Sequence, residues 1–125
     1  MAASRPVFTE NFSKNLEALR EFCAASGDDD AFERIWKRFL YEVLPTLRRM
    51  PRTGRPFLEH SVRSRKARTL VARLRARVRS GDELRELVLG DFLILYLLRG
   101  RQLVFLAIKH HRQLSFDLGR FWALP

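Results

Sequence analysis

The sequence predicts an α+β fold in which helices come first and an antiparallel sheet follows. Apolar residues recur at helical spacing through the first half of the chain, with an aromatic-rich stripe between Phe32 and Leu47. From Leu84 onward, apolar runs of strand length are separated by breaks of two or three residues. Connections this short join antiparallel neighbours, so the second half of the chain is expected to form a meander.

Size and composition favour one globular domain. The chain has 125 residues, 46% of them hydrophobic and 30% charged, so residues 1–125 are expected to share one core. The longest apolar run, from Phe92 to Leu98, is far shorter than the roughly 18 residues of a membrane-spanning helix. The start of the chain has no apolar stretch typical of a secretory signal. We therefore expect a cytoplasmic protein with no membrane partner.

A short strand and two helices are expected in the first fifty residues. Val7–Thr9 has strand character, and Ser13 is predicted to be the N-cap of the first helix. Asp28–Asp30 places negative charge at the start of the second helix, where the helix dipole favours it. Asp30 and Glu33 have the spacing of a capping box.

The second helix carries the strongest apolar stripe in the chain. A stripe at this spacing is more often core than a base-stacking platform, so we assign it to the core. Pro45 lies inside the stripe and is expected to kink the helix or to end it near Leu44. Pro51, Gly54 and Pro56 then mark a break. The residues of the stripe are Phe32, Ile35, Trp36, Phe39, Leu40, Val43 and Leu47.

The positive charge is concentrated in one segment. The chain has 24 Lys and Arg against 14 Asp and Glu, a net charge of +10. Residues 48–79 hold twelve of the basic residues and one acid, Glu59. Arginine presents a planar fork of donors that suits phosphate or carboxylate. A nucleic-acid backbone and an acidic protein segment are therefore both candidate partners, and a solvated basic face without a specific ligand is the third alternative.

A third, basic helix is predicted between Arg63 and Arg79. Ala67, Leu70, Val71, Leu74 and Val78 fall on one of its faces, and arginines occupy the others. Ser80–Asp82 ends it. The candidate binding residues of this helix are Arg63, Arg65, Lys66, Arg68, Arg73, Arg75, Arg77 and Arg79.

The three apolar runs, Leu84–Leu89, Phe92–Leu98 and Leu103–Ile108, are the predicted strands of the meander. The near-continuous apolar character of Phe92–Leu98 indicates a central strand buried on both faces. The N-terminal strand is expected to add to one edge, which gives a three- to four-stranded sheet. Helices would cover one face of this sheet and leave the other face, or a cleft beside it, for function.

Catalytic chemistry has one candidate location, Lys109–Arg112 at the end of the last strand. The sequence has no glycine-rich phosphate loop, no Cys or His pair at metal spacing and no Gly-x-Ser-x-Gly, so neither a metal nor a cofactor is expected. Adjacent strand residues point to opposite faces, which prevents His110 and His111 from sharing a metal ion. One histidine together with Arg112 can support RNA cleavage through proton transfer and charge stabilisation. The alternative is a strand-end histidine and a solvated arginine with no catalytic role.

The order of elements and four motifs resemble the toxins of the RelE/ParE superfamily, from bacterial type II toxin–antitoxin systems. The motifs are the exit from the second helix at Leu47–Arg55, then Glu83–Leu87, Gly90–Tyr96 and Val104–Arg112. The last two are the most specific, because they combine a strand ending in Tyr with an apolar strand ending in His and Arg. The resemblance spans nearly the whole chain.

This resemblance implies a small cytoplasmic toxin that a cognate antitoxin wraps and blocks. The antitoxin is then a further candidate ligand of the basic helix, which looks like an insertion relative to compact members. RelE-like members cut mRNA in the ribosomal A site, with basic residues that hold and activate the phosphate. ParE-like members poison DNA gyrase and have no nuclease chemistry.

Departures from the RelE-like pattern favour a non-classical or ParE-like mechanism. Leu84 and Glu86 stand where RelE-like nucleases carry Lys, and Leu93 stands where they carry Arg. Leu118 replaces an aromatic acid or base, and Arg112 alone matches a basic catalytic position. Because other nucleases of this fold use histidine, His111 keeps mRNA cleavage open as the second mechanism. A non-enzymatic nucleic-acid-binding module that uses the Arg63–Arg79 helix is the alternative from another class.

Overall fold

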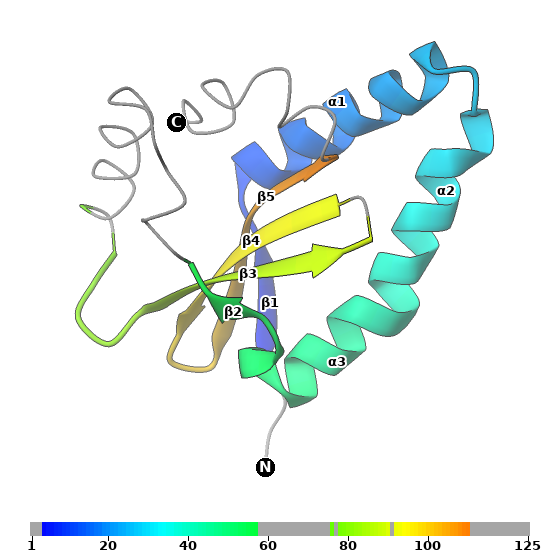
Figure 1. Ribbon diagram of the computed structural model, residues 1–125. Helices are drawn as coiled ribbons and strands as arrows, with labels where there is room; N and C mark the ends of the chain where they lie inside the picture. Colours follow the sequence, from blue (N-terminus) through cyan, green and yellow to red (C-terminus); the bar gives the residue numbers. More distant parts are fainter. Residues whose placement is uncertain (1–3, 58–75, 77, 91, 111–125) are drawn as a thin grey trace.

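The computed structural model describes residues 4–57, 76, 78–90 and 92–110, with His110 described by its backbone alone. Helices form one layer against a five-stranded sheet (Figure 1). In chain order the elements are β1 (Arg5–Phe8), α1 (Glu10–Ala25), α2 (Asp29–Arg38), the π-helical turn η1 (Phe39–Val43), α3 (Leu44–Arg49), the 3-10 turn η2 (Pro51–Thr53), β2 (Arg55–Pro56), β3 (Glu83–Leu89), β4 (Phe92–Arg99) and β5 (Gln102–His110).

The sheet has the strand order β1-β5-β4-β3-β2. β3, β4 and β5 form the predicted antiparallel meander, and β1 adds in parallel to the free edge of β5. The α+β prediction is therefore confirmed, but the sheet has five strands instead of three or four. The extra strand is β2, in which Arg55 and Pro56 pair with Glu86 and Arg85. A proline is tolerated there because β2 lies at the edge of the sheet and needs fewer ladder donors.

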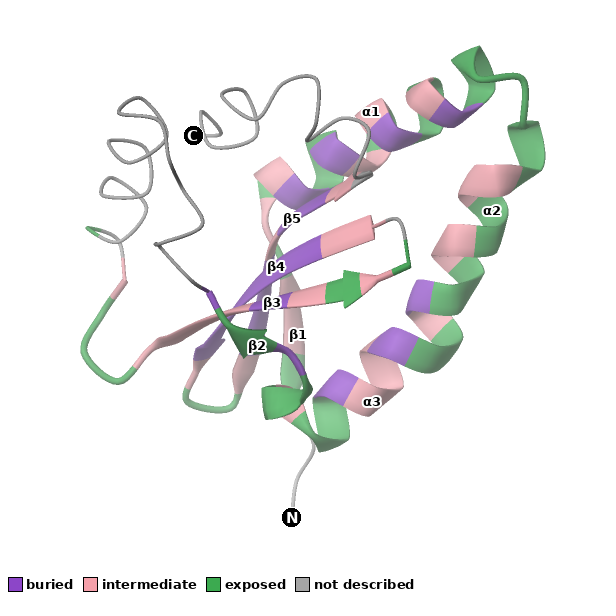
Figure 2. Cartoon of the chain, in the orientation of Figure 1, coloured by how far each residue is buried: buried purple, intermediate pink, exposed green. Residues whose placement is uncertain are grey.

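The predicted apolar stripe of the second helix is confirmed as core. Phe39 and Leu47 are fully buried, and the other members are buried or packed against the same cluster. Figure 2 shows this pattern as an intermediate face of α2 that continues into buried residues of η1 and α3, turned toward the sheet, with exposed residues opposite. The core is rich in aromatic residues, since Trp36 stacks on Phe39 at 5.4 Å and Phe39 meets Phe105 edge-on at 5.2 Å.

Pro45 does not end the second helix: of the two outcomes expected there, a kink or a stop near Leu44, the stop is wrong. The Leu44 N–H bonds to the carbonyl of Phe39, five residues back, so the hydrogen-bond ladder changes to π spacing just before the proline. Pro45 is the second residue of α3, directly after this π-helical turn, so it lies inside a continuous run of helical residues. Helical structure continues to Arg49.

Two predicted helix caps are wrong. The N-cap of α1 is Thr9, not Ser13, because Thr9 directly follows β1 and keeps extended dihedral angles. Its Oγ1 accepts a hydrogen bond from the Phe12 N–H at 3.1 Å. In α2, Asp28 is the N-cap residue and its side chain makes no capping bond, since its carboxylate pairs with Arg34 at 2.7 Å instead. Asp30 therefore cannot start a capping box.

β4 is buried on both faces, as predicted for a central strand. Ile94 and Tyr96 face the helices and are fully buried, while Leu95 and Leu97, which alternate with them, are 4% and 5% exposed. The register with β5 shifts between Leu95 and Tyr96, which leaves Leu106 as an extra residue on β5.

Polar side chains of α1 complete the edge of β5 beyond this bulge. β1 ends at Phe8, so among the described residues no strand pairs with the second half of β5 on that side. The Asn11 amide donates to the Leu106 carbonyl at 2.9 Å, and the Ile108 N–H donates to Asn15 Oδ1 at 3.1 Å. Asn15 is 4% exposed, which a polar side chain tolerates only when it is hydrogen-bonded. These bonds fix the end of β5, where the sequence places its candidate catalytic residues.

Candidate functional site

The predicted catalytic and binding residues lie largely outside the described part of the chain. His111, Arg112 and the predicted basic helix, apart from Ala76, Val78 and Arg79, belong to the segments that are not described. His110 ends β5 at the register position opposite Phe92. Arg79 is exposed and precedes β3. The assignment of His110, His111 and Arg112 to catalysis, and of the basic helix to binding, stays a prediction.

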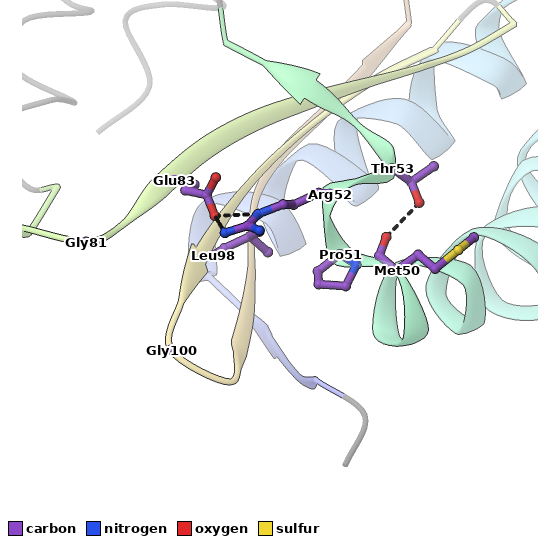
Figure 3. A pocket seen from close by; sticks show the side chains of 8 residues that line it. All are labelled: Met50, Pro51, Arg52, Thr53, Gly81, Glu83, Leu98 and Gly100. Atoms are coloured by element: carbon purple, nitrogen blue, oxygen red, sulfur yellow. Dashed lines mark hydrogen bonds and ion pairs between the residues drawn. The ribbon is translucent and has the colours of Figure 1, made fainter. Parts of the chain in front are cut away.

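Within the described residues, a hollow of about 590 Å³ lies where η2, the start of β3 and the β4–β5 turn meet (Figure 3). Sequence reasoning did not predict it, because its walls come from three separate parts of the chain. Its lining residues are Met50, Pro51, Arg52, Thr53, Gly81, Glu83, Leu98 and Gly100.

One wall of the hollow is held in place by Tyr96. The fully buried Tyr96 hydroxyl accepts a hydrogen bond from the Gly54 N–H at 2.9 Å and donates one to the Pro51 carbonyl at 2.8 Å. Burial raises the pKa of Tyr96, so the hydroxyl keeps the proton that this second bond requires. The η2 turn is therefore fixed to the centre of the sheet.

An arginine–glutamate network forms the floor beside this wall. Arg52 contacts the Glu83 carboxylate at 2.9 Å, and Arg85 contacts the same group at 3.4 Å (Figure 3 shows the first contact). The Arg52 hydrogen bond, with a smaller contribution from Arg85, lowers the pKa of Glu83. Arg85 also donates to the Gly54 carbonyl at 2.5 Å. Glu83 is thus a structural anion and is unsuited to act as a general acid near neutral pH.

A second ion pair joins the start of β3 to the end of β4. Asp82 accepts from Arg99 at 2.7 Å and from the Arg79 N–H at 2.7 Å, and its side chain is 3% exposed. The hydrogen bonds from Arg99 lower the pKa of Asp82. Arg99 is not one of the residues that line the hollow, but it lies between Leu98 and Gly100, which do line it.

The Asp82 pair predicts an acid-dependent loss of stability. A carboxyl whose pKa is lowered on folding stabilises the fold above its unfolded pKa, near 3.8, and this stabilisation is lost as the pH falls through the folded value. Asp82→Asn is therefore expected to lower the free energy of unfolding at pH 7, and the difference from the parent should shrink below about pH 4. Urea denaturation across this range measures both effects.

Glu17→Gln is the matched control for that experiment, because Glu17 is an exposed carboxylate in the middle of α1. It should change stability by less than about 0.5 kcal/mol. An Asp82→Asn difference that stays constant down to pH 3 would contradict the assignment.

The network residues carried a weak signal in the sequence. Glu83 and Arg85 alternate along one strand, which places both on the same face of the sheet. Arg52 lies in the break after the second helix, inside the basic segment. No pattern linked Gly54 to Tyr96, because 42 residues separate them.

Comparison with known proteins identifies the family to which this chain belongs. The model of a family described as "ParE toxin of type II toxin-antitoxin system, parDE" matches residues 7–115, which include every described strand and helix except the first two residues of β1. The chain therefore belongs to the ParE toxin family, within the superfamily that its motifs resemble. No curated protein matches it. In the described part of the chain, no helix is long and apolar enough to cross a membrane.

Proposed function

We propose that this protein is a cytoplasmic toxin that inhibits DNA gyrase and is neutralised by a cognate antitoxin. Membership of the ParE family supports the toxin class. The observation that carries the choice of gyrase over mRNA is Glu86, which stands at a position where RelE-like nucleases carry Lys. The Glu86 side chain is largely buried, and its carboxylate pairs with Arg55 at 2.8 Å.

A carboxylate at this position is unfavourable for phosphoryl transfer, because its negative charge repels the phosphate. Phosphoryl transfer needs cations near the phosphate oxygens, where one well-placed donor is worth roughly 3 kcal/mol of transition-state stabilisation. Leu84 and Leu93 lie on the same sheet face as Glu86, because they pair with Leu97 and Val88. Three positions that bear cations in the RelE-like pattern thus offer two apolar side chains and one anion.

The test is a supercoiling assay with purified gyrase and the purified chain. We expect supercoiling to be inhibited in proportion to the amount of toxin. The product of the neighbouring antitoxin gene, added in equal amount, should restore it. Induced cells should show unchanged mRNA ends.

Other outcomes would overturn this proposal in distinct ways. New mRNA ends that disappear with His111→Ala or Arg112→Ala, with gyrase unaffected, would establish the ribonuclease mechanism and its predicted residues. Normal growth on expression of the chain, together with salt-dependent nucleic-acid binding, would favour the non-enzymatic module.

A further inference from the structure

Arginines from four separate parts of the chain lie at the end of the sheet that holds the hollow. The Arg5 N–H bonds to the Arg101 carbonyl at 2.7 Å, which brings β1 to the β4–β5 turn. The Arg48 side chain bonds to the Ser4 carbonyl at 3.1 Å, so the end of α3 reaches the same place. In Figure 1 the start of β1, the end of α3 and the β4–β5 turn lie together at this end. We call this set the arginine rim: Arg5, Arg48, Arg49, Arg52, Arg79, Arg99 and Arg101.

The rim has a large surplus of positive charge. All its members are exposed except Arg99, which is partly exposed. Among the described residues, the carboxylates beside it are Asp82 and Glu83, and each is already paired with a rim arginine at 2.7–2.9 Å. Seven guanidinium groups against two carboxylates leave a net charge of +5. Such a surface attracts an extended polyanion through many exposed contacts.

We propose that the arginine rim binds the phosphodiester backbone of a nucleic acid. Arginine matches phosphate oxygens with two parallel donors. Arg52 lines the open hollow, and Arg49 and Arg101 directly adjoin the lining residues Met50 and Gly100 in the chain. The contacts would be to the backbone and would carry no base preference. This surface shares only Arg79 with the predicted basic helix, since its other six members lie outside Arg63–Arg79 in the sequence.

The scarcity of exposed apolar side chains around the hollow, among the described residues, argues against an acidic protein as the principal partner. A stable protein interface needs a desolvated centre of apolar or aromatic anchors. Of the exposed large hydrophobic side chains in the described residues, Met50 borders the hollow, whereas Phe8, Tyr41 and Val88 belong to segments that do not line it. A phosphate backbone requires charge without such anchors.

The experiment measures binding of the purified chain to a short labelled DNA duplex and to a single-stranded RNA, by fluorescence anisotropy at increasing salt. The rim variant is Arg5→Gln, Arg49→Gln, Arg101→Gln, because these three side chains are exposed and make no ion pair with described residues. We expect it to bind at least about tenfold more weakly at physiological salt. The slope of log affinity against log salt should fall by about 3, roughly one for each lost phosphate contact. Comparison of the two affinities shows whether the rim binds the DNA backbone or the RNA backbone more tightly.

The matched control is Lys14→Gln, Arg20→Gln, Lys37→Gln, which removes the same charge from α1 and α2. It should lose much less affinity than the rim variant, and both should keep the parent's circular dichroism. Equal losses of affinity in the two variants would mean that net charge alone determines binding, and this result would overturn the proposal. Unchanged nucleic-acid binding by the rim variant would also overturn the proposal. If that variant also loses affinity for a glutamate-rich peptide, the result indicates an acidic protein partner instead.

The result does not depend on the proposed target. Gyrase inhibition is measured separately, so the rim can fail while the toxin assignment stands. A further variant, Arg65→Gln, Arg68→Gln, Arg75→Gln, separates any contribution of the predicted basic helix. If that variant loses all nucleic-acid binding and the rim variant keeps full binding, the nucleic-acid surface lies on the predicted basic helix instead.

Discussion

Phe105→Ala is expected to lower the free energy of unfolding by about 3–5 kcal/mol, the range for removing a large buried aromatic side chain. Phe105 is fully buried and lies where the sheet meets the helices. Its ring centre is 5.2 Å from Phe39, 5.6 Å from Phe12 and 5.2 Å from Phe8. Truncation therefore opens a cavity with rigid aromatic walls, which cannot collapse to fill it. Urea denaturation followed by circular dichroism measures the loss.

Tyr41→Ala is the matched control, because Tyr41 is an aromatic residue of η1 that is 76% exposed. Its effect should stay within about 0.5 kcal/mol, as for most surface substitutions. A loss below about 1 kcal/mol for Phe105→Ala would mean that the aromatic cluster is not tightly packed.

Gly54→Ala should destabilise the fold by about 1–3 kcal/mol, the usual cost of forcing an extra group into a packed interior. The φ angle of Gly54 is −70°, so the backbone accepts any residue and the cost is steric. A Cβ would lie 2.5 Å from the Tyr96 hydroxyl and 2.7 Å from the Glu86 carbonyl, which belongs to the neighbouring strand and cannot move freely. The η2 wall of the hollow must shift to relieve these contacts.

A double-mutant cycle with Tyr96→Phe tests this origin. Tyr96→Phe alone removes both hydrogen bonds of the hydroxyl and should cost about 1–3 kcal/mol. The double variant lacks the closest clashing atom, so its loss of stability should be smaller than the sum of the two single losses. Strict additivity in urea denaturation would show that the hydroxyl is not what excludes a side chain at position 54.

The sequence predicted the long elements well because burial alone determines them. The stripe through Phe39 and the run through Tyr96 can be placed only against a core, whatever the details of the fold. β2 was missed because two residues, one of them a proline, carry no periodicity, and its strand character comes entirely from pairing with β3. The Ser13 cap failed for a similar reason, since the start of α1 is set by where β1 leaves β5.

The candidate site was only partly predictable. Charge counting found the segment that holds Arg48, Arg49, Arg52 and Arg79, but it gave no reason to include Arg5 or Arg101. These two join the site through the parallel pairing of β1 with β5, a contact between residues nearly 100 positions apart. Tertiary contacts of this kind leave no local pattern, so the rim emerges only when the strand order is known.

The amide side chains of α1 also determine how this sheet can meet other chains. An incoming extended peptide usually attaches to an open strand by matching its backbone donors and acceptors. Between Leu106 and Ile108, the edge of β5 offers no such ladder, because Asn11 bonds the Leu106 carbonyl and Asn15 bonds the Ile108 N–H. Strand addition by a binding peptide is therefore blocked along that stretch, and a partner that docks there must do so through side chains.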